Sequence, residues 1–262
     1  MNRYIFYCAF VIFAFVDKLP PTLAELAEAH HIFWDSNRRI PIAILSKNFY
    51  LEPCSAEKES HRRLFQEVFT DSDTMRYWAD GRIRHMEEVL PALKRFASPW
   101  KNFHLTGAFV VMQNDQAIML IGVGLFQAAG VGEFYIIAHP SIRGKGMTGE
   151  VMGVLKKWCV FLRESNVPAF INYVNGKKAV LSTVFATASE ENIASIRMLL
   201  KSGFRPLKSF ERYRMGFPKA ATMFPAPSDI QGLDSGYLSM IYPTRYIKRK
   251  AGFELHVRNI VR

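Results

Sequence analysis

Apolar positions in the first hundred residues recur mostly at helical spacing. Residues 56–69 carry apolar side chains three and four positions apart, which predicts an amphipathic helix. Residues 82–96 follow a similar pattern, and Pro91 is expected to divide or kink that helix because proline has no backbone N–H. Residues 71–81, between the two helices, are rich in capping and turn residues, and residues 42–51 predict a short strand.

From about residue 104 the pattern changes to that of a sheet with interleaved helices. Gln113–Gln116 separates two apolar runs and is typical of a hairpin turn. Strands that alternate with long helices are typical of parallel crossovers, so we predict a mixed α/β fold. The predicted elements are strands over 104–112, 117–126 and 132–138, a helix over 148–163, a strand over 180–188 and a helix over 190–201.

The two ends of the chain differ from this central pattern. Tyr4–Val16 is an unbroken apolar run, shorter than the ~20 residues that span a bilayer. It fits a buried strand or helix, a signal or membrane-associated segment, or a start codon assigned too early. Residues 217–242 are irregular and rich in proline and glycine, whereas 246–261 could form a strand or a helix. We therefore divide the chain into an N-terminal extension (1–40), a central domain (41–217) and a C-terminal extension (218–262).

Composition narrows the class of protein. Hydrophobic residues make up 49% and charged residues 22% of the 262, which is typical of a globular protein and excludes disordered and collagen-like chains. The formal charge is +11, which favours anionic partners such as a phosphorylated cofactor, nucleic acid or an acidic membrane. The three cysteines lie far apart without metal-binding spacing, so we expect reduced thiols, no metal site and a cytoplasmic protein.

Candidate chemistry begins where the third predicted strand ends. After His139 and Pro140, a loop with Gly144 and Gly146 leads directly into the helix predicted over 148–163. Such a loop exposes backbone N–H groups at the positive end of a helix dipole, where phosphate oxygens bind. The loop lacks the ending of a P-loop and the GxGxxG spacing of dinucleotide-binding folds. Taken alone, it predicts either a pyrophosphate site or a simple tight turn.

The helix over 190–201 supplies a second feature. Asn192 stands at its start and Gly203 after its end, which alone indicates a capped surface helix. Together the two features give the order strand, Arg-x-x-Gly loop, helix, strand and an Asn-x-x-Ser helix ending in Gly-Phe. This order resembles the GNAT acetyltransferase superfamily over residues 44–215. The resemblance rests on Arg143, Gly146 and Thr148 in the loop, on Asn192, Ser195, Gly203 and Phe204 in the helix, and on Tyr50–Pro53 and Asp73–Trp78, which look like the Rim-type, N-terminal-amine branch.

The resemblance implies an α/β fold with a mixed, mostly antiparallel central sheet, flanking helices and one splayed parallel strand pair. The splay would hold acetyl coenzyme A, with its pantetheine arm on the third strand and its pyrophosphate on the loop amides. Asn192 would lie near the thioester. The implied cofactor-binding residues are Ile136, Ile137, Ala138, Arg143, Gly144, Lys145, Gly146, Met147, Thr148, Gly149, Asn192 and Ser195.

Transfer to an amine also needs a group that accepts a proton. Glu133, at the start of the third strand, is the leading candidate, the alternative being an ordinary carboxylate at a strand end. His139 is a second candidate for a base or proton shuttle, or else a structural histidine. Two positions depart from the family pattern: Thr148 replaces a glycine or alanine, and Leu199 replaces the tyrosine that serves many relatives as general acid.

We therefore expect an acyl-coenzyme A-dependent N-acyltransferase, in which an amine attacks the thioester directly within a ternary complex. The acceptor could be a protein N-terminus, a lysine or a small amine. Two alternatives stay open. One is a catalytically degenerate protein that binds coenzyme A without transfer. The other is a basic adaptor for nucleic acid or membrane, for which the aromatic and basic segment Pro243–Lys250 is the main feature.

Overall fold

A computed structural model describes the central domain and one segment near the C-terminus. The described residues are 32–35, 40–78, 81–101, 105–125, 130–164, 170–171, 178–189, 191–206 and 250–256. The apolar run Tyr4–Val16 and the irregular segment 217–242 lie outside them, as does most of Pro243–Lys250. Within the described part of the chain, no helix is long and apolar enough to cross a membrane.

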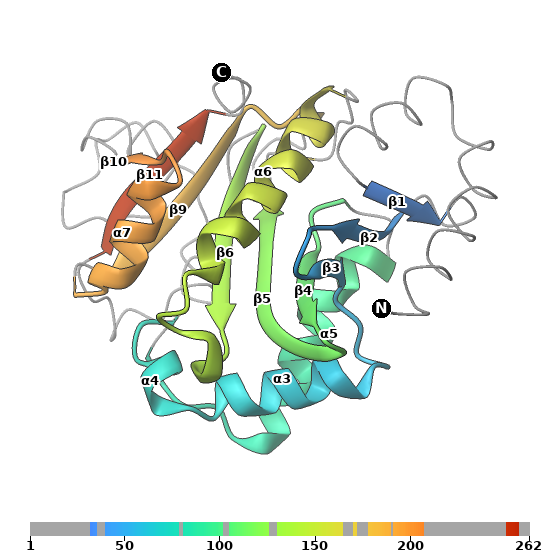
Figure 1. Cartoon of the computed structure of the whole chain (residues 1–262), viewed down its shortest axis with the longest axis vertical. Helices are drawn as coiled ribbons and strands as arrows, with labels where there is room; N and C mark the ends of the chain where they lie inside the picture. The colour runs from blue at the N-terminus through green and yellow to red at the C-terminus, as the bar shows by residue number, and fades with distance from the viewer. Residues whose placement is uncertain are drawn as a thin grey trace, which may run out of the picture.

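The described strands form one large sheet and a separate two-stranded ribbon, β7–β8. Neighbouring strands of the large sheet pair in the order β1-β2-β3-β4-β5-β6-β9-β11-β10 (Figure 1). Every pairing in it is antiparallel except that of β6 with β9, which is parallel. The strands are β1 (Ile32–Asp35), β2 (Ile40–Leu45), β3 (Tyr50–Pro53), β4 (Ala108–Gln113), β5 (Gln116–Leu125), β6 (Val131–Ala138), β7 (Phe170–Ile171), β8 (Lys178–Ala179), β9 (Thr183–Ser189), β10 (Arg205–Pro206) and β11 (Lys250–His256).

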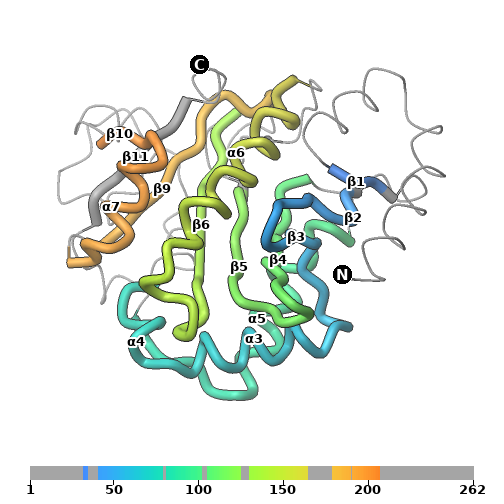
Figure 2. The backbone as a smooth tube through the Cα atoms, in the orientation of Figure 1, coloured from blue at the N-terminus to red at the C-terminus, as the bar shows by residue number. Residues whose placement is uncertain are grey.

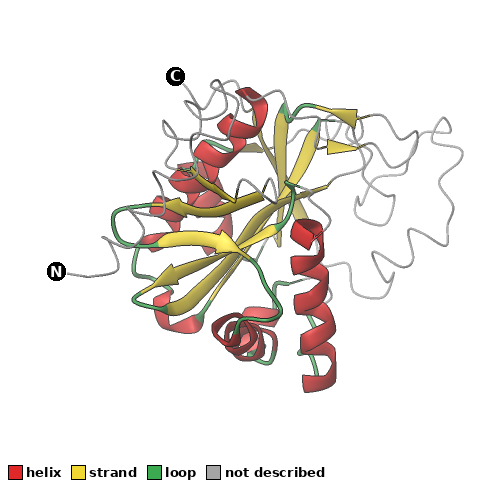
Figure 3. Cartoon of the chain, turned by 90° about the vertical axis from the view of Figure 1, so that its right-hand side faces the viewer, coloured by secondary structure: helices red, strands yellow, loops and turns green. Residues whose placement is uncertain are grey.

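Helices cover both faces of this sheet. The longer helices α6 and α5 lie on opposite faces, and α7 is on the same side as α6 (Figures 1 and 3). The mixed sheet and its flanking helices confirm the predicted fold class. The helical elements are α3 (Glu59–Phe69), α4 (Ser72–Met75), α5 (Met86–Lys101), η1 (Pro140–Ile142, a 3₁₀ turn), α6 (Met147–Glu164) and α7 (Ile193–Lys201).

Three local expectations differ from the structure. Residues 42–51 are part of two strands, because Ser46 donates its N–H to the carbonyl of Phe49 (2.9 Å) and closes a turn between β2 and β3. Pro91 does not divide α5, which runs unbroken to Lys101. Residues 250–256, expected in a C-terminal extension, form β11 within the large sheet, and β1 similarly adds residues of the expected N-terminal extension. The strand alternative for the last segment is thus the one observed.

An aromatic core holds α6 against the sheet. Trp158 of α6 is only 1% exposed and its ring meets that of Phe109 from β4 edge to face, with centroids 5.4 Å apart. Trp158 also stacks on Phe161, one turn further along the helix, at 5.5 Å. Such pairs add to the hydrophobic stabilisation from buried area. The helix that follows the glycine loop is therefore fixed rigidly to the sheet.

The parallel strands β6 and β9 separate before they end. Their pairing extends from Val131 with Thr183 to Phe134 with Ala186 and stops there, although β6 continues to Ala138 and β9 to Ser189. Figure 1 shows the two strands close together at the top and diverging toward η1 and α4. The splayed parallel pair expected from the family resemblance is therefore present.

Candidate functional site

The divergence of β6 and β9 opens a cleft of about 540 Å³. Its lining combines the free ends of both strands with the first turns of α7, the start of the glycine loop and the segment around α4. On its other edge β6 stays paired to β5, with Ile136 opposite Ile121 and Ala138 opposite Met119. Beyond Phe134, the edge of β6 that faces β9 has no strand partner among the described residues. Its peptide groups can therefore hydrogen-bond an extended ligand.

The loop between β6 and α6 has the backbone geometry of an anion site. Gly144 and Gly146 both adopt φ of +75°, which side-chain-bearing residues rarely do. A Cβ atom added at either glycine, or at Gly149, would meet nothing within 4 Å. The open space on this side of the loop leaves room for a bulky anion.

Among the described residues, several amides at the start of α6 and in the loop before it have no backbone acceptor. Lys145 donates its N–H to Ile142 and Gly149 donates to Gly146, both at 3.3 Å. No backbone acceptor is recorded within the described residues for the N–H groups of Gly144, Gly146, Met147 and Thr148. The last two belong to the first turn of α6, where the helix dipole also favours negative charge.

Helix α7 contributes the opposite wall of the cleft. Asn192 caps this helix, because its side-chain oxygen accepts the N–H of Ser195 (3.1 Å). Both residues line the cleft. Leu199 also lines it and is 2% exposed, so the position where many relatives have a tyrosine offers no proton. The capping bond fixes the side chain of Asn192 next to the separated strands.

An aromatic wall closes the cleft on the side of α4 and α5. Trp78, Phe96 and Tyr135 line the cleft and are in mutual ring contact, with centroids 5.4 to 6.5 Å apart. The side chain of Tyr135 packs against Gly122 of β5, where an added Cβ would lie 2.5 Å from its hydroxyl oxygen. Burial raises the pKa of Tyr135 well above its usual value, so its hydroxyl stays protonated. Glu133 lines this part of the cleft too.

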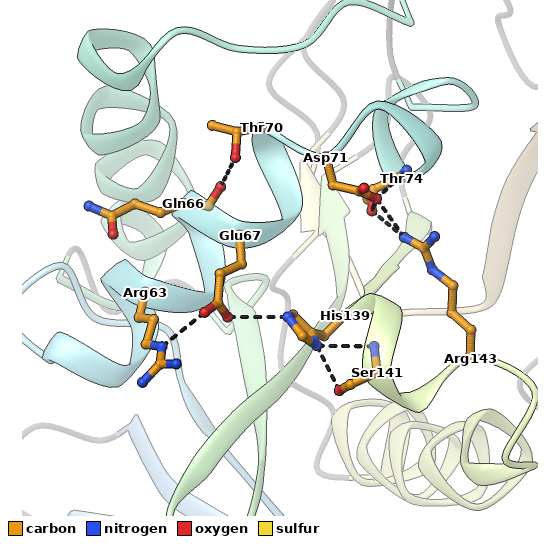
Figure 4. Close-up of polar contacts among 9 residues, drawn as sticks. All are labelled: Arg63, Gln66, Glu67, Thr70, Asp71, Thr74, His139, Ser141 and Arg143. Carbon is orange, nitrogen blue, oxygen red and sulfur yellow. Dashed lines mark hydrogen bonds and ion pairs between the residues drawn. The ribbon is translucent and has the colours of Figure 1, made fainter.

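Two polar contacts attach the turn after β6 to the α3–α4 segment (Figure 4). The ring of His139 lies with Nε2 3.2 Å from a carboxylate oxygen of Glu67, while its Nδ1 accepts the N–H of Ser141 (3.2 Å). Arg143 lies 3.2 Å from the carboxylate of Asp71 and donates to the hydroxyl of Thr74. Figure 2 shows the chain of α4 passing beside this turn.

Most of the predicted site residues meet at the cleft. Those that line it are Glu133, Ile136, Ile137, Ala138, Arg143, Gly144, Thr148, Asn192 and Ser195. Lys145 and Gly146 of the adjoining loop, and Met147 and Gly149 in the first turn of α6, are not part of the lining, and neither is His139. Both ring nitrogens of His139 are engaged at the turn after β6, Nε2 by Glu67 and Nδ1 by Ser141. The sequence did not indicate the aromatic wall, because Trp78, Phe96 and Tyr135 come from three separate segments of the chain.

The splayed sheet, the glycine loop and the capped α7 define a class of acyl-group transferase, and a comparison of sequences agrees. A family model described as the acetyltransferase (GNAT) domain matches residues 49–205. The chain therefore belongs to the GNAT acetyltransferase family. Among curated proteins, none matches the sequence significantly.

Solved structures of GNAT acetyltransferases share the fold at low sequence identity. An acetyltransferase of the GNAT family from Bacillus anthracis has a TM-score of 0.55 and 14% identity, covering 82% of this chain and 99% of that one. A spermidine N-acetyltransferase from Vibrio cholerae, in complex with coenzyme A and spermine, has a TM-score of 0.52 and 13% identity over 83% and 100% of the chains. RimL, a ribosomal L7/L12 alpha-N-protein acetyltransferase, has a TM-score of 0.55 and 10% identity over 86% and 99%. At these identities the likeness establishes the fold.

Proposed function

We propose that this protein transfers an acetyl group from acetyl coenzyme A to a primary amine. The observation that supports the proposal is that the cleft and the glycine loop adjoin each other. The parted strands β6 and β9 open a cleft, and the glycine loop with the first turn of α6 lies at one end of it, where four amides have no backbone acceptor among the described residues.

The residues present fit coenzyme A. A pantetheine arm is extended and carries amide groups, which match the unpaired backbone edge of Ile136, Ile137 and Ala138. A pyrophosphate matches the amides at Gly144, Gly146, Met147 and Thr148, and the φ of +75° at both glycines keeps side chains away from it. Lys145, which is exposed, and Arg143 add positive charge to this loop.

The proposed role of Glu133 is to accept the proton that the acceptor amine loses. Acetyl coenzyme A would supply a thioester carbonyl as the acyl donor. The amine nitrogen must carry a free electron pair to attack that carbon, so a base within reach of the cleft is needed. Glu133 lines the cleft on β6, one residue before the strand pairing with β9 ends. The carbon–sulfur bond then breaks with its electron pair on sulfur, and Leu199 cannot donate a proton to it.

The walls of the cleft favour an amine with an apolar body. The rings of Trp78, Phe96 and Tyr135 offer apolar surface, and Asp73 of α4 adds a carboxylate near them. An ammonium group is attracted both to aromatic faces and to carboxylates. Two structural relatives are described as acting on spermidine and on a ribosomal protein, so amine acceptors of very different size occur on this fold.

A transfer assay with a matched pair of variants tests the proposal. Release of free coenzyme A thiol would be followed with spermidine and with a peptide bearing a free N-terminus, using the wild type, Glu133→Gln and Glu88→Gln. Glu88 lies on α5, pairs with Arg82 and does not line the cleft, so its variant controls for the loss of a carboxylate. We expect Glu133→Gln to lower kcat/KM for the amine by ~10²-fold or more, with unchanged coenzyme A affinity, and Glu88→Gln to behave as the wild type.

One outcome would favour a second function. The buried Leu199 stands in the cleft where many relatives carry their general acid. Tight coenzyme A binding without transfer to either amine would favour a coenzyme A-binding protein that has lost catalysis. Transfer at equal rates by Glu133→Gln would instead remove Glu133 from the proposed mechanism.

A further inference from the structure

Arg143 is held by only part of its guanidinium group. Its Nη2 atom donates to the carboxylate of Asp71 (3.2 Å) and to the hydroxyl of Thr74 (Figure 4). Its Nε and Nη1 atoms have no partner recorded in the described parts of the chain. Because a guanidinium carries five N–H groups in one plane, fixing one nitrogen orients the remaining three N–H groups.

The partner that fixes Arg143 is itself rigidly held. Asp71 caps α4, where one carboxylate oxygen accepts the N–H of Thr74 (2.8 Å) and also the Thr74 hydroxyl. Partial burial tends to raise the pKa of Asp71, but the hydrogen bonds from Thr74 and Arg143 outweigh burial and lower it. Asp71 therefore stays ionised at neutral pH and presents a fixed acceptor to Arg143.

The cluster Asp71–Thr74–Arg143 lies at the edge of the candidate cofactor site. Arg143 and Thr74 line the cleft, and Arg143 directly precedes Gly144, whose amide has no backbone acceptor within the described residues. The side chain of Arg143 is 38% exposed and that of Asp71 is 29% exposed. The cluster thus remains accessible to a ligand anion.

We propose that Asp71, together with Thr74, is a positioning residue that orients Arg143 toward a phosphate group of coenzyme A. The inference rests on the proposed function and deepens it, because it extends the phosphate site from the loop backbone to a side chain fixed by α4. Arg143 meets the phosphate through Nε and Nη1, while Nη2 keeps its contacts with α4.

A different role for the contact between Asp71 and Arg143 predicts the opposite change in coenzyme A affinity when Asp71 is removed. If Asp71 merely neutralised Arg143, a phosphate would have to displace the carboxylate, and removing Asp71 would tighten coenzyme A binding. Under the positioning role, removing Asp71 frees a flexible side chain that must be ordered again on binding, so affinity falls. The direction of the change therefore separates the two roles.

Two substitutions at position 71 isolate this contact from the stability of α4. Serine and asparagine are both good N-cap residues, so Asp71→Ser and Asp71→Asn keep the cap. Serine is too short to reach Arg143, whereas asparagine can still offer it a neutral oxygen. By calorimetric titration, we expect coenzyme A to bind ~10-fold more weakly to Asp71→Ser than to the wild type, and the loss of affinity to be smaller for Asp71→Asn. The unfolding midpoints of both variants should equal that of the wild type.

A double-mutant cycle completes the test. Because Asp71 is proposed to act through Arg143, Asp71→Ser should add nothing once Arg143→Gln is present, and neither variant should change the binding of pantetheine, which lacks the phosphates. Tighter or unchanged coenzyme A binding by Asp71→Ser would overturn the positioning role, as would a full effect in the Arg143→Gln background. A folded wild type that fails to bind coenzyme A would instead contradict the proposed function itself.

Discussion

Two polar clusters lie near the two ends of α3, and they differ in how many of their polar groups have hydrogen-bond partners. In the first, Glu52 of β3 binds His61 of α3 (2.8 Å) and Lys58 (2.5 Å), and His61 is fully buried. The other ring nitrogen of His61 accepts the N–H of Ser55 (3.0 Å), so both nitrogens have partners. In the second cluster, Asp71–Thr74–Arg143, the carboxylate is equally engaged, but the Nε and Nη1 atoms of Arg143, which lines the cleft, have no partner among the described residues.

Burial and the pairing of polar groups distinguish a structural cluster from a functional one. A buried cluster with every group paired stabilises the fold, and loss of one partner leaves a desolvated polar group behind. A half-exposed cluster contributes little to stability, because water can replace any lost partner. Its retained donors and its place at the cleft point to ligand binding.

The largest effect on the free energy of unfolding is expected from substitution of Glu52. Glu52→Ala leaves the buried ring of His61 without its acceptor, so we expect the free energy of unfolding to fall by about 3 kcal/mol. Chemical denaturation would measure the loss. Coenzyme A affinity of the folded variant should match the wild type, since Glu52 does not line the cleft. An unfolding free energy within error of the wild type would show that this cluster is not structural.

The same carboxylate should make stability depend on pH. Burial opposes ionisation of Glu52, but hydrogen bonds from His61 and Lys58 outweigh it and hold its pKa below the ordinary value of 4.5. A lowered pKa in the folded state stabilises the protein above pH 4.5, and this stabilisation is lost as the pH falls through the folded-state pKa. The stability advantage of the wild type over Glu52→Gln should therefore be constant above about pH 5 and shrink at lower pH. An advantage that grows on acidification would contradict the assignment.

A smaller effect is expected at the exposed end of the buried cluster. The side chain of Lys58 is 51% exposed, so its ion pair with Glu52 is screened by water. Lys58→Ala should cost about 1 kcal/mol or less of unfolding free energy, and Glu52 keeps its bond to His61. A loss as large as that of Glu52→Ala would mean that Lys58, and not the buried histidine, determines the energy of the cluster.

The smallest effect on stability is expected in the second cluster. Asp71→Ser keeps the cap of α4, so its unfolding free energy should lie within about 0.5 kcal/mol of the wild type. This near-neutral result would stand beside the expected loss of coenzyme A affinity. A large destabilisation would place Asp71 with Glu52 among structural residues and remove the contrast.

Local patterns were sufficient to predict the elements that build the cofactor side of the site. The turn at Asn114 and Asp115, both with positive φ, confirms the hairpin between β4 and β5. The glycines before α6 likewise predicted a loop that exposes backbone N–H groups, and the structure adds that Gly144 and Gly146 have positive φ. These features depend on residues adjacent in sequence, so their signals are strong.

Features that depend on distant contacts could not be read from the sequence. Asp71 and Arg143 are 72 positions apart and neither belongs to a pattern that names the other. The insertion of β11 between β9 and β10 is likewise a long-range pairing. The basic residues before α5, Arg82, Arg84 and His85, do not line the cleft, and Arg82 is paired with Glu88. The place of Tyr135 in the aromatic wall likewise depends on ring contacts with Trp78 and Phe96, which are distant in sequence.

Binding of coenzyme A by the glycine loop and the parted strands can be measured by titration. Calorimetry would compare the wild type with Gly146→Asp and Gly153→Asp. Both substitutions add one carboxylate where a Cβ meets nothing within 4 Å. Gly146, with φ of +75°, belongs to the loop, so its substitution also strains the loop backbone, whereas Gly153 lies farther along α6. Binding with a Kd of roughly micromolar in the wild type and Gly153→Asp, lost in Gly146→Asp, is the expected result. A folded wild type that gives no heat, or equal binding by all three proteins, would contradict coenzyme A binding at this loop.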